Sequence, residues 1–474
     1  MVKKDFPLVH YYDQDFVDIY ERSWVWLSDF LGKGTAENGF GPFYFKYPES
    51  DCINLYETFM ASFFLVYNSR NFPVSNILDV FYEKQEENGA IRCQYSEETG
   101  KPVFDDDNPE GLCPPLFAWV EYNLYHKVGA KKRIKEVMPK LELYYEWIEN
   151  TWKDEESGFY KVPLSATTMA DAPRGDAAYF VDFNSQMAVN SLYMAALGDV
   201  LNDKELSFKY KKKYFSLKTR ISSKMWDRDE SFYYDLDENM EPVKVKTIAA
   251  YWPLLAEIPN EERAEAIIAH LKDPQLFGGP NPFPTVAINE PSFKEDGNGH
   301  NGSVFPALTF MVVKALEKYG KYEMSREMSI KHIYSILDTF HPVSGKKGTL
   351  WEAYAPLKEG PATIAGDVEN NRKLYLGCTG LSTIALMIEN VIGLYISLPR
   401  KTVDWIVPIL EVMGIEDLNL KRNKITILSN KSGRGWEIRL ESEKLYYFTI
   451  DILGEKKKTL PIPSGKCSML IDKL

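Results

Sequence analysis

Residues 114–152 read PPLFAWVEYNLYHKVGAKKRIKEVMPKLELYYEWIENTW, and this stretch decides the fold. Its apolar side chains recur at three- and four-residue spacing, which is the period of an amphipathic helix. They are Leu116, Trp119, Val120, Leu124, Ile134, Val137, Met138, Leu141, Tyr144, Tyr145 and Ile148. Gly129 divides the pattern into two runs, and so short a break between helices makes an antiparallel hairpin. The stretch therefore predicts two packed antiparallel helices, over residues 114–128 and 131–152.

The same period extends over residues 11–397. It predicts further helices over residues 11–32, 53–68, 73–87, 181–202, 204–225, 245–257, 260–271, 302–319, 322–339 and 380–395. Short breaks at 202–203, 259–260 and 320–321 pair several of them into further hairpins. A closed toroid of this kind has twelve helices in six hairpins, and its inner helices enclose a funnel. We therefore expect a mainly α protein with an (α/α)6 six-hairpin toroid.

The pattern changes after Pro399. Residues 424–429, 436–442 and 446–453 are rich in β-branched and aromatic side chains, and two of these runs alternate clearly, which predicts strands. We expect two domains, a helical one over residues 1–399 and a small β-sheet cap over residues 400–474. The cap is expected to dock on the helices and to be structural.

Composition and charge narrow the function. The 474 residues include 56 Lys and Arg against 68 Asp and Glu, a formal charge of −12. An acidic chain repels phosphate backbones, so nucleic acid is not an expected partner. No run of 18 or more apolar residues occurs, which predicts no membrane span. The first residues, MVKKDF, lack the apolar segment of a signal peptide, so we expect a cytoplasmic protein, or an exported one whose signal peptide has been removed.

Several chemistries find no support in the motifs. The five cysteines form no CxxC pair and no zinc spacing, which predicts free thiols. Residues 297–302 fit GxGxxG, but a polar loop rather than a strand precedes them, which argues against a dinucleotide site. The six histidines form no HExxH motif and no GxSxG elbow occurs. We expect no cofactor and no metal, and the acidic run 105–107 is either a calcium ligand or, more simply, a solvated loop.

The remaining candidates for catalytic residues are carboxylates in long loops that are rich in aromatic residues. Aromatic residues make up 14% of the chain, a supply that suits either a bulky core or a flat ligand such as a sugar. Two loop segments stand out, SATTMADAPR at 165–174 and LWEAYAP at 350–356. Glycoside hydrolysis needs a carboxylic acid on one side of the scissile bond and a carboxylate on the other. Only a closed fold can bring segments so far apart in sequence together, and for either carboxylate alone a solvated loop is the alternative.

An ordered series of motifs over residues 40–397 resembles the trehalase-like six-hairpin glycosidases, nearest to glycoside hydrolase family 63 and the mannosylglycerate hydrolase group. The motifs are NLYETFM at 54–60, QEENGAIR at 85–92, PPLFAW at 114–119, VDFN at 181–184, NGSVFP at 301–306, WEAYAP at 351–356 and GCTG at 377–380. Each motif alone is weak, and their order and spacing carry the resemblance.

The resemblance implies that Glu352 is the general base, because it falls on the family's EnYnP segment. The family's general acid lies in a G-M-D-x-x-P-R segment, and this chain has Ala170 at that position, with Asp171 one step later. Three explanations remain open: Asp171 serves from an altered loop, the chain is an inactivated variant, or it is a natural relative with changed or lost chemistry. Asp176 and Asp182 are further carboxylates nearby, and a buried cap at a helix start is the simpler interpretation of Asp182.

Five further residues are candidates for binding substrate. The resemblance places Glu57 on a sugar-hydroxyl contact, with a helix-start role as the alternative. Tyr56, Trp119 and Trp351 would provide stacking faces or would be plain core. Arg174 would hold a sugar hydroxyl or lock its loop through a salt bridge.

The function that the resemblance implies is single-step, inverting hydrolysis of an α-linked glucoside or similar short saccharide by an exo-acting enzyme. Its two carboxyl groups should stand about 6.5–9.5 Å apart. A glycoside phosphorylase is a rival, but it needs an anion pocket in place of the base, and Glu352 argues against that. A sugar-binding relative that lost the acid is a second rival, which Ala170 keeps open. The sugar and the oligomeric state are not determined by the sequence.

Overall fold

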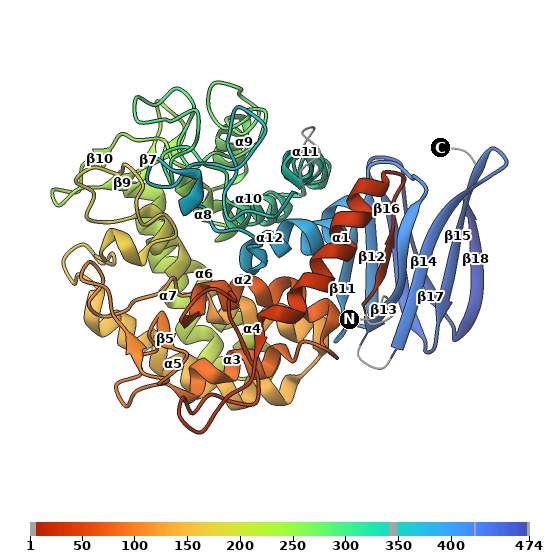
Figure 1. The fold of residues 1–474 in the computed structure, drawn as a ribbon, viewed down its shortest axis with the longest axis horizontal. Coiled ribbons are helices and arrows are strands. Elements are labelled where there is room, and N and C mark those ends of the chain that lie inside the picture. Colours follow the sequence, from red (N-terminus) through yellow and green to blue (C-terminus); the bar gives the residue numbers. More distant parts are fainter. Residues whose placement is uncertain (1–5, 341–347, 421–422, 472–474) are drawn as a thin grey trace.

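The structure is a computed structural model that describes residues 6–340, 348–420 and 423–471. It is rich in helices, and its C-terminal part is a β-sheet region, as predicted (Figure 1). The helices gather in one body and the long strands stack against one side of it, next to α1 (Figure 1). Within the described residues, no helix is long and apolar enough to cross a membrane.

The helices follow the predicted period closely. They are α1 (Gln14–Trp26), α2 (Leu55–Leu65), α3 (Val74–Glu83), α4 (Phe117–Val128), α5 (Lys131–Trp152), α6 (Val181–Leu201), α7 (Lys204–Lys224), α8 (Trp252–Leu255), α9 (Glu261–Ala269), α10 (Pro306–Lys318), α11 (Tyr322–Phe340) and α12 (Leu376–Gly380). The hairpin of α4 and α5 is confirmed, and Gly129 ends α4 in the left-handed conformation (φ 74°), which glycine adopts without steric cost.

Two predicted helices differ from the structure. The helix expected over 245–257 is a 3₁₀ turn, Ile248–Tyr251, followed by the single turn α8. The helix expected over 380–395 continues α12 as a π-type helix, Leu381–Val391, and then stops. Gly393 has φ 88°, which breaks the helix, and residues 394–397 form a strand instead.

The helices contact one another in chain order. Helix α2 contacts α4, α4 contacts α6, α6 contacts α8, and α8 contacts α10. The order returns to its start, because α10 contacts α12 and α12 contacts α2. Helices α3, α7 and α11 each pack on one member of this series, and α5 packs on two, α4 and α6. As a result the N-terminal ends of several helices meet around one space.

The long strands form two sheets. One has the order β1-β13-β14-β15-β18 and the other β11-β12-β16-β17. The strands are β1 (Leu8–His10), β11 (Leu394–Ser397), β12 (Thr402–Val407), β13 (Met413–Leu420), β14 (Asn423–Ser432), β15 (Gly435–Ser442), β16 (Tyr446–Ile452), β17 (Lys456–Ile462) and β18 (Gly465–Ile471). Shorter pairs in the loops are β2 (Leu31–Gly32) with β3 (Tyr44–Phe45), β4 (Cys52–Asn54) with β5 (Gln94–Ser96) and β6 (Pro102–Val103), β7 (Trp226–Asp227) with β8 (Phe232–Tyr233), and β9 (Asp235–Leu236) with β10 (Pro242–Val243).

The three predicted strands are confirmed as β14, β15 and β16. The N-terminal strand β1 was not expected, and it pairs antiparallel with β13, so both ends of the chain contribute to one sheet. The fully buried Trp405 of β12 donates its indole N–H to the carbonyl of Ile392 at 2.6 Å. This hydrogen bond joins the β-sheet region to the end of the last helix.

Candidate active site

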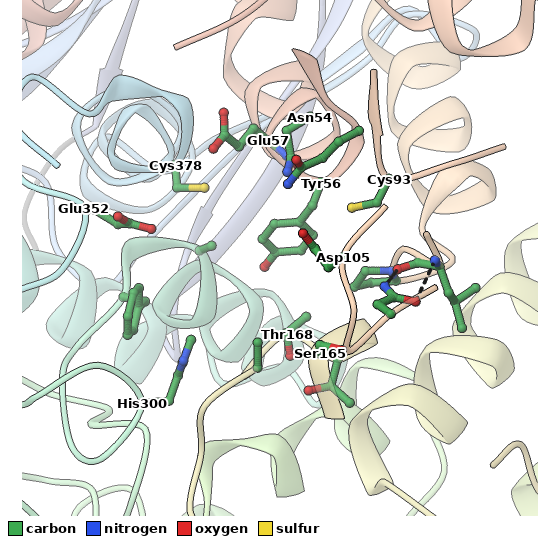
Figure 2. A pocket seen from close by; sticks show the side chains of 18 of the residues that line it. Asn54, Tyr56, Glu57, Cys93, Asp105, Ser165, Thr168, His300, Glu352 and Cys378 are labelled. Atoms are coloured by element: carbon green, nitrogen blue, oxygen red, sulfur yellow. Dashed lines mark hydrogen bonds between the residues drawn. The ribbon is translucent and has the colours of Figure 1, made fainter. Parts of the chain in front are cut away.

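A pocket of about 330 Å³ lies where the N-terminal ends of the helices meet. The starts of α2, α10 and α12 contribute Glu57, Leu308 and Cys378, and the loops contribute Asp105, His300 and Glu352. Figure 2 shows the side chains of Glu352, His300, Asp105 and Tyr56 around one open space. A concave site of this size suits one small polar ligand.

One wall of the pocket is built around Arg372. Its Nε and one terminal nitrogen donate to the two carboxylate oxygens of Glu352, both at 2.7 Å. The other terminal nitrogen donates to Oε1 of Glu57 at 2.7 Å. The hydroxyl of Tyr375 donates to the same Glu57 oxygen at 2.7 Å, and the guanidinium lies 4.0 Å from the Tyr375 ring centre. One cation therefore orients both carboxylates.

Local structure explains how this wall is held. Asn54 caps α2 by accepting from the backbone N–H of Glu57 at 3.1 Å, and this places Glu57 in the first helical turn. The backbone N–H of Glu352 donates to the carbonyl of Arg372 at 3.1 Å, which brings the two loop segments together. Burial would lower the pKa of Arg372, but Tyr375, Glu352 and Glu57 outweigh it and raise that pKa. The guanidinium therefore stays charged.

A second wall comes from the loop before α6, which carries Thr167, Thr168 and Ala170. The hydroxyl of Thr168 donates to Asp182 at 3.0 Å. Asp182 is fully buried and pairs with Arg174 at 2.9 Å. The hydroxyl of Thr168 thus connects the buried ion pair of Asp182 and Arg174 to the lining of the pocket.

Asp171 does not belong to the lining of the pocket, whereas its neighbour Ala170 does. The Asp171 carboxylate bonds Nδ1 of His300, which does line the pocket, and lies 3.4 Å from the His300 backbone nitrogen. The imidazole stacks on Phe305 with ring centres 4.4 Å apart. A Cβ at Gly299 would stand 2.2 Å from an Asp171 oxygen, so the glycine permits this approach. The GxGxxG pattern is therefore a turn that receives Asp171.

Electrostatics at Asp171 favour its charged form. Burial would raise the pKa of Asp171, but the hydrogen bonds and the charge of His300 outweigh this, and the pKa lies below its usual value. The Asp171 side chain is 56% exposed. A general acid must be protonated near the working pH, so this carboxyl group on its own has the wrong shift for proton donation.

Arg174 locks its loop. It is buried and donates to both oxygens of Asp235, at 2.7 and 2.6 Å, and its guanidinium lies 4.7 Å from the Phe180 ring centre. Of the two roles considered for Arg174, these contacts are those of a structural salt bridge. Asp235 also accepts from the backbone N–H of Val181 at 2.7 Å. Asp235, and not Asp182, therefore satisfies the start of α6.

The predicted site residues divide into two groups. Tyr56, Glu57 and Glu352 line the pocket, whereas Asp171, Arg174, Trp119 and Trp351 do not. The Trp119 ring packs 4.5 Å from Phe63 and borders a second cavity at the other end of α4. Trp351 is partly buried, with the Lys373 amine 5.4 Å from its ring centre.

Sequence reasoning missed Arg372, Tyr375 and the role of His300. Arg372 has no motif of its own, and only its proximity to the GCTG turn at 377–380 could have drawn attention to it. His300 was considered only as a metal ligand and as part of the glycine pattern. Among the described residues, no group of three or more His, Cys, Asp or Glu side chains could hold a metal ion.

Comparison with known proteins identifies the family of the chain. Residues 75–364 match the mannosylglycerate hydrolase MGH1-like glycoside hydrolase domain, which is more than half of the chain. The chain belongs to this family, within the trehalase-like GH63 group. Residues 393–474 match the C-terminal domain of trehalase.

Two relatives illustrate the range of sequence similarity. A Borreliella burgdorferi protein described as uncharacterized is 50% identical over the whole of both chains. A mannosylglycerate hydrolase of Thermus thermophilus is 31% identical over 99 residues, which are 20% of this chain and 23% of that protein.

Among solved structures, a GH63 mannosylglycerate hydrolase from Thermus thermophilus, in complex with glucose, has a TM-score of 0.61 at 17% identity. The match covers 78% of this chain and 99% of that one. An α-L-rhamnosidase from Aspergillus terreus has a TM-score of 0.64 at 13% identity, over 98% of this chain and 50% of that one. Likenesses at these identities show a shared fold.

Proposed function

We propose that the protein is an exo-acting, inverting glycoside hydrolase of an α-linked glucoside or similar short saccharide. The observation that carries the proposal is the pocket of a family glycosidase in which Glu352 and Glu57 share one guanidinium, Arg372. In this proposal the ring-order helix contacts are those of a six-hairpin toroid with its funnel at the pocket. Residues 1–399 supply the chemistry, and residues 400–474 support them as a β-sheet cap.

Glu352 acts as the general base. Arg372 holds both of its oxygens, which fixes the carboxylate and supplies the opposite charge. Glu352 removes a proton from a water molecule, the water oxygen bonds to the anomeric carbon, and the bond from that carbon to the leaving oxygen breaks. Glu57 contacts a sugar hydroxyl beside this reaction centre.

Asp171 and His300 act together as the general acid. Asp171 holds the imidazole through Nδ1 and balances its positive charge, and His300 delivers the proton to the leaving oxygen from the pocket side. An aspartate that orients a histidine in this way is a recurring arrangement in acid–base catalysis. This assignment explains how a chain with Ala170 at the family's acid position can keep a proton donor.

The other candidates act from outside the pocket lining. Arg174 holds the loop that carries Thr168 and Ala170 in place, through Asp182 and Asp235. Trp351 and Trp119 support the base loop and the start of the funnel. Each is a positioning residue in this proposal, and substrate stacking falls to Tyr56 and Phe305, which line the pocket.

The proposal is tested by NMR-monitored hydrolysis with the unmodified protein. The panel holds α- and β-linked disaccharides and, because structures of the Thermus relative contain glucose, Tris and D-glycerate, also glycosyl-glycerates. Turnover of an α-linked member is the expected result. Saccharide binding by calorimetry without turnover of any member would overturn the proposal in favour of a sugar-binding protein.

A further inference from the structure

We infer that the pocket selects an uncharged or amine-bearing glycoside and discriminates against one that carries a carboxylate. This inference rests on the proposed function, because it names the substrate class of the same site. The relevant feature is the balance of charged side chains around the pocket.

The charged groups of the pocket are mostly acidic. Among the described residues that line it, the carboxylates are Glu57, Asp105 and Glu352, and the only guanidinium is that of Arg372. The imidazole of His300 is already paired with the carboxylate of Asp171. The side chains therefore leave an excess of two negative charges for a ligand to meet.

Arg372 is poorly available to a ligand carboxylate. Three of its nitrogens each donate to a carboxylate oxygen of Glu352 or Glu57. Its guanidinium also lies against the face of Tyr375, at 4.0 Å from the ring centre. A ligand carboxylate would have to compete with two protein carboxylates for this one cation.

Neither the start of α2 nor that of α4 reverses this balance. The N-terminus of α2 carries partial positive charge, which would attract an anion. Glu57 already occupies the first turn of α2, and Asn54 accepts from one of its free N–H groups. Pro114 and Pro115 precede α4, and proline has no N–H to offer an anion.

Asp105 is an exposed carboxylate among the residues that line the pocket. Figure 2 shows its side chain among those that surround the open space of the pocket. In the part of the chain that the structure describes, no cation pairs with Asp105. An anionic aglycone that enters the pocket would therefore approach an uncompensated carboxylate, and like charges at close range disfavour each other.

A matched pair of substrates tests the inference. Glucosylglycerol and glucosylglycerate differ in one group, a hydroxymethyl against a carboxylate, and the mannosyl pair offers the same contrast. We expect kcat/KM to favour the uncharged member of the pair at least tenfold at low ionic strength, and less at high salt, where charges are screened. Asp105→Asn should narrow the ratio about threefold or more, whereas Asp106→Asn, on the same loop outside the lining, should leave it unchanged.

The outcomes separate this inference from the proposed function. Equal or faster turnover of the glycerate glycoside would overturn the inference and leave the hydrolase standing. If neither is hydrolysed, calorimetry decides: tighter binding of glucosylglycerol supports the charge selection while the hydrolase fails, and tighter binding of glucosylglycerate overturns both. Binding of neither up to millimolar concentration would remove the pocket as a glycoside site and the inference with it.

Discussion

Two ion-pair clusters lie at opposite ends of the same helices and differ in charge balance. At the pocket end, one guanidinium, Arg372, serves two carboxylates, Glu57 and Glu352, and is 36% exposed. At the other end, Glu389 of the last helix pairs with Lys127 of α4 at 3.0 Å and with Lys314 of α10 at 2.6 Å. Lys314 also pairs with Glu317 at 2.7 Å.

The difference separates a reactive cluster from a structural one. The second cluster has two lysines for two glutamates, each side chain at most 14% exposed, so its charges are compensated inside the protein. The pocket cluster is short of one positive charge and is open to a ligand. Charge imbalance at an accessible place is the feature that we connect with catalysis, and balance in a buried place is the feature that we connect with stability.

The largest expected effect comes from removing the base. Glu352→Gln should lower kcat by about 10³- to 10⁴-fold, because acid–base groups contribute on the order of 10²- to 10⁴-fold. The urea midpoint should change little, since Arg372 keeps its bond to Glu57. NMR assays of hydrolysis and urea titrations measure the two quantities. Glu136→Gln, on the exposed face of α5, is the control, and equal activity of both variants would contradict the assignment.

Breaking the buried cluster around Glu389 should lower the stability of the protein and leave its rate of hydrolysis unchanged. Lys314→Met leaves Glu389 and Glu317 short of a partner, and disrupting a buried pair costs about 3–5 kcal/mol of unfolding free energy. The kinetic constants of the folded fraction should stay close to those of the unmodified protein. Urea titration measures the loss, with the exposed Lys466→Met as control. A loss below about 1 kcal/mol would show that the cluster is not structural.

The next effect is expected from removing the members of the proposed acid pair, His300 and Asp171. His300→Ala should lower kcat by about 10²-fold or more, if the imidazole donates the proton. Asp171→Asn should lower kcat less, by about tenfold, because the imidazole stays in the pocket and loses only the partner that orients it. NMR assays of hydrolysis measure both rates, and an Asp171→Asn variant as active as the unmodified protein would contradict the pairing.

The smallest expected effect is on the pH dependence of stability, and it comes from the titration of Glu389. Burial would raise its pKa, but Lys127 and Lys314 lower that pKa from 4.5 to about 2. The folded-state pKa is below the unfolded one, so this group stabilises the fold above pH 4.5, and the contribution is lost as pH falls from 4.5 toward 2. Urea midpoints over this range should fall with decreasing pH, and the slope should be shallower in Glu389→Gln. Parallel slopes in the two proteins would contradict the assigned shift.

The sequence predicted the helices better than it predicted the site. Helical period and turn glycines are local, so α4, Gly129 and α5 could be located within a few residues. Strands β1 and β13 pair the two ends of the chain, and nothing local in residues 8–10 indicates that partner.

In the pocket, too, the sequence predicted the residues that belong to local motifs and missed those whose partners are distant in sequence. Glu352, Glu57 and Tyr56 were found through motifs, and the structure places all three in the lining. Arg372 was missed because its importance comes from partners 20 and 315 residues away in sequence. Trp119 shows a further limit of the sequence, because a large aromatic residue suits a protein core as well as a sugar-binding face. In the structure its ring packs 4.5 Å from the Phe63 ring and lies outside the pocket lining.

The most direct test of the account compares the unmodified protein with Ala170→Asp in the same NMR assay of an α-linked substrate, following the anomeric proton of the first-formed sugar. The account predicts turnover by the unmodified protein with the β-anomer formed first, and no requirement for an aspartate at position 170. Turnover only after Ala170→Asp would contradict it, because the acid would then belong at position 170 and the Asp171–His300 pair would not supply the proton.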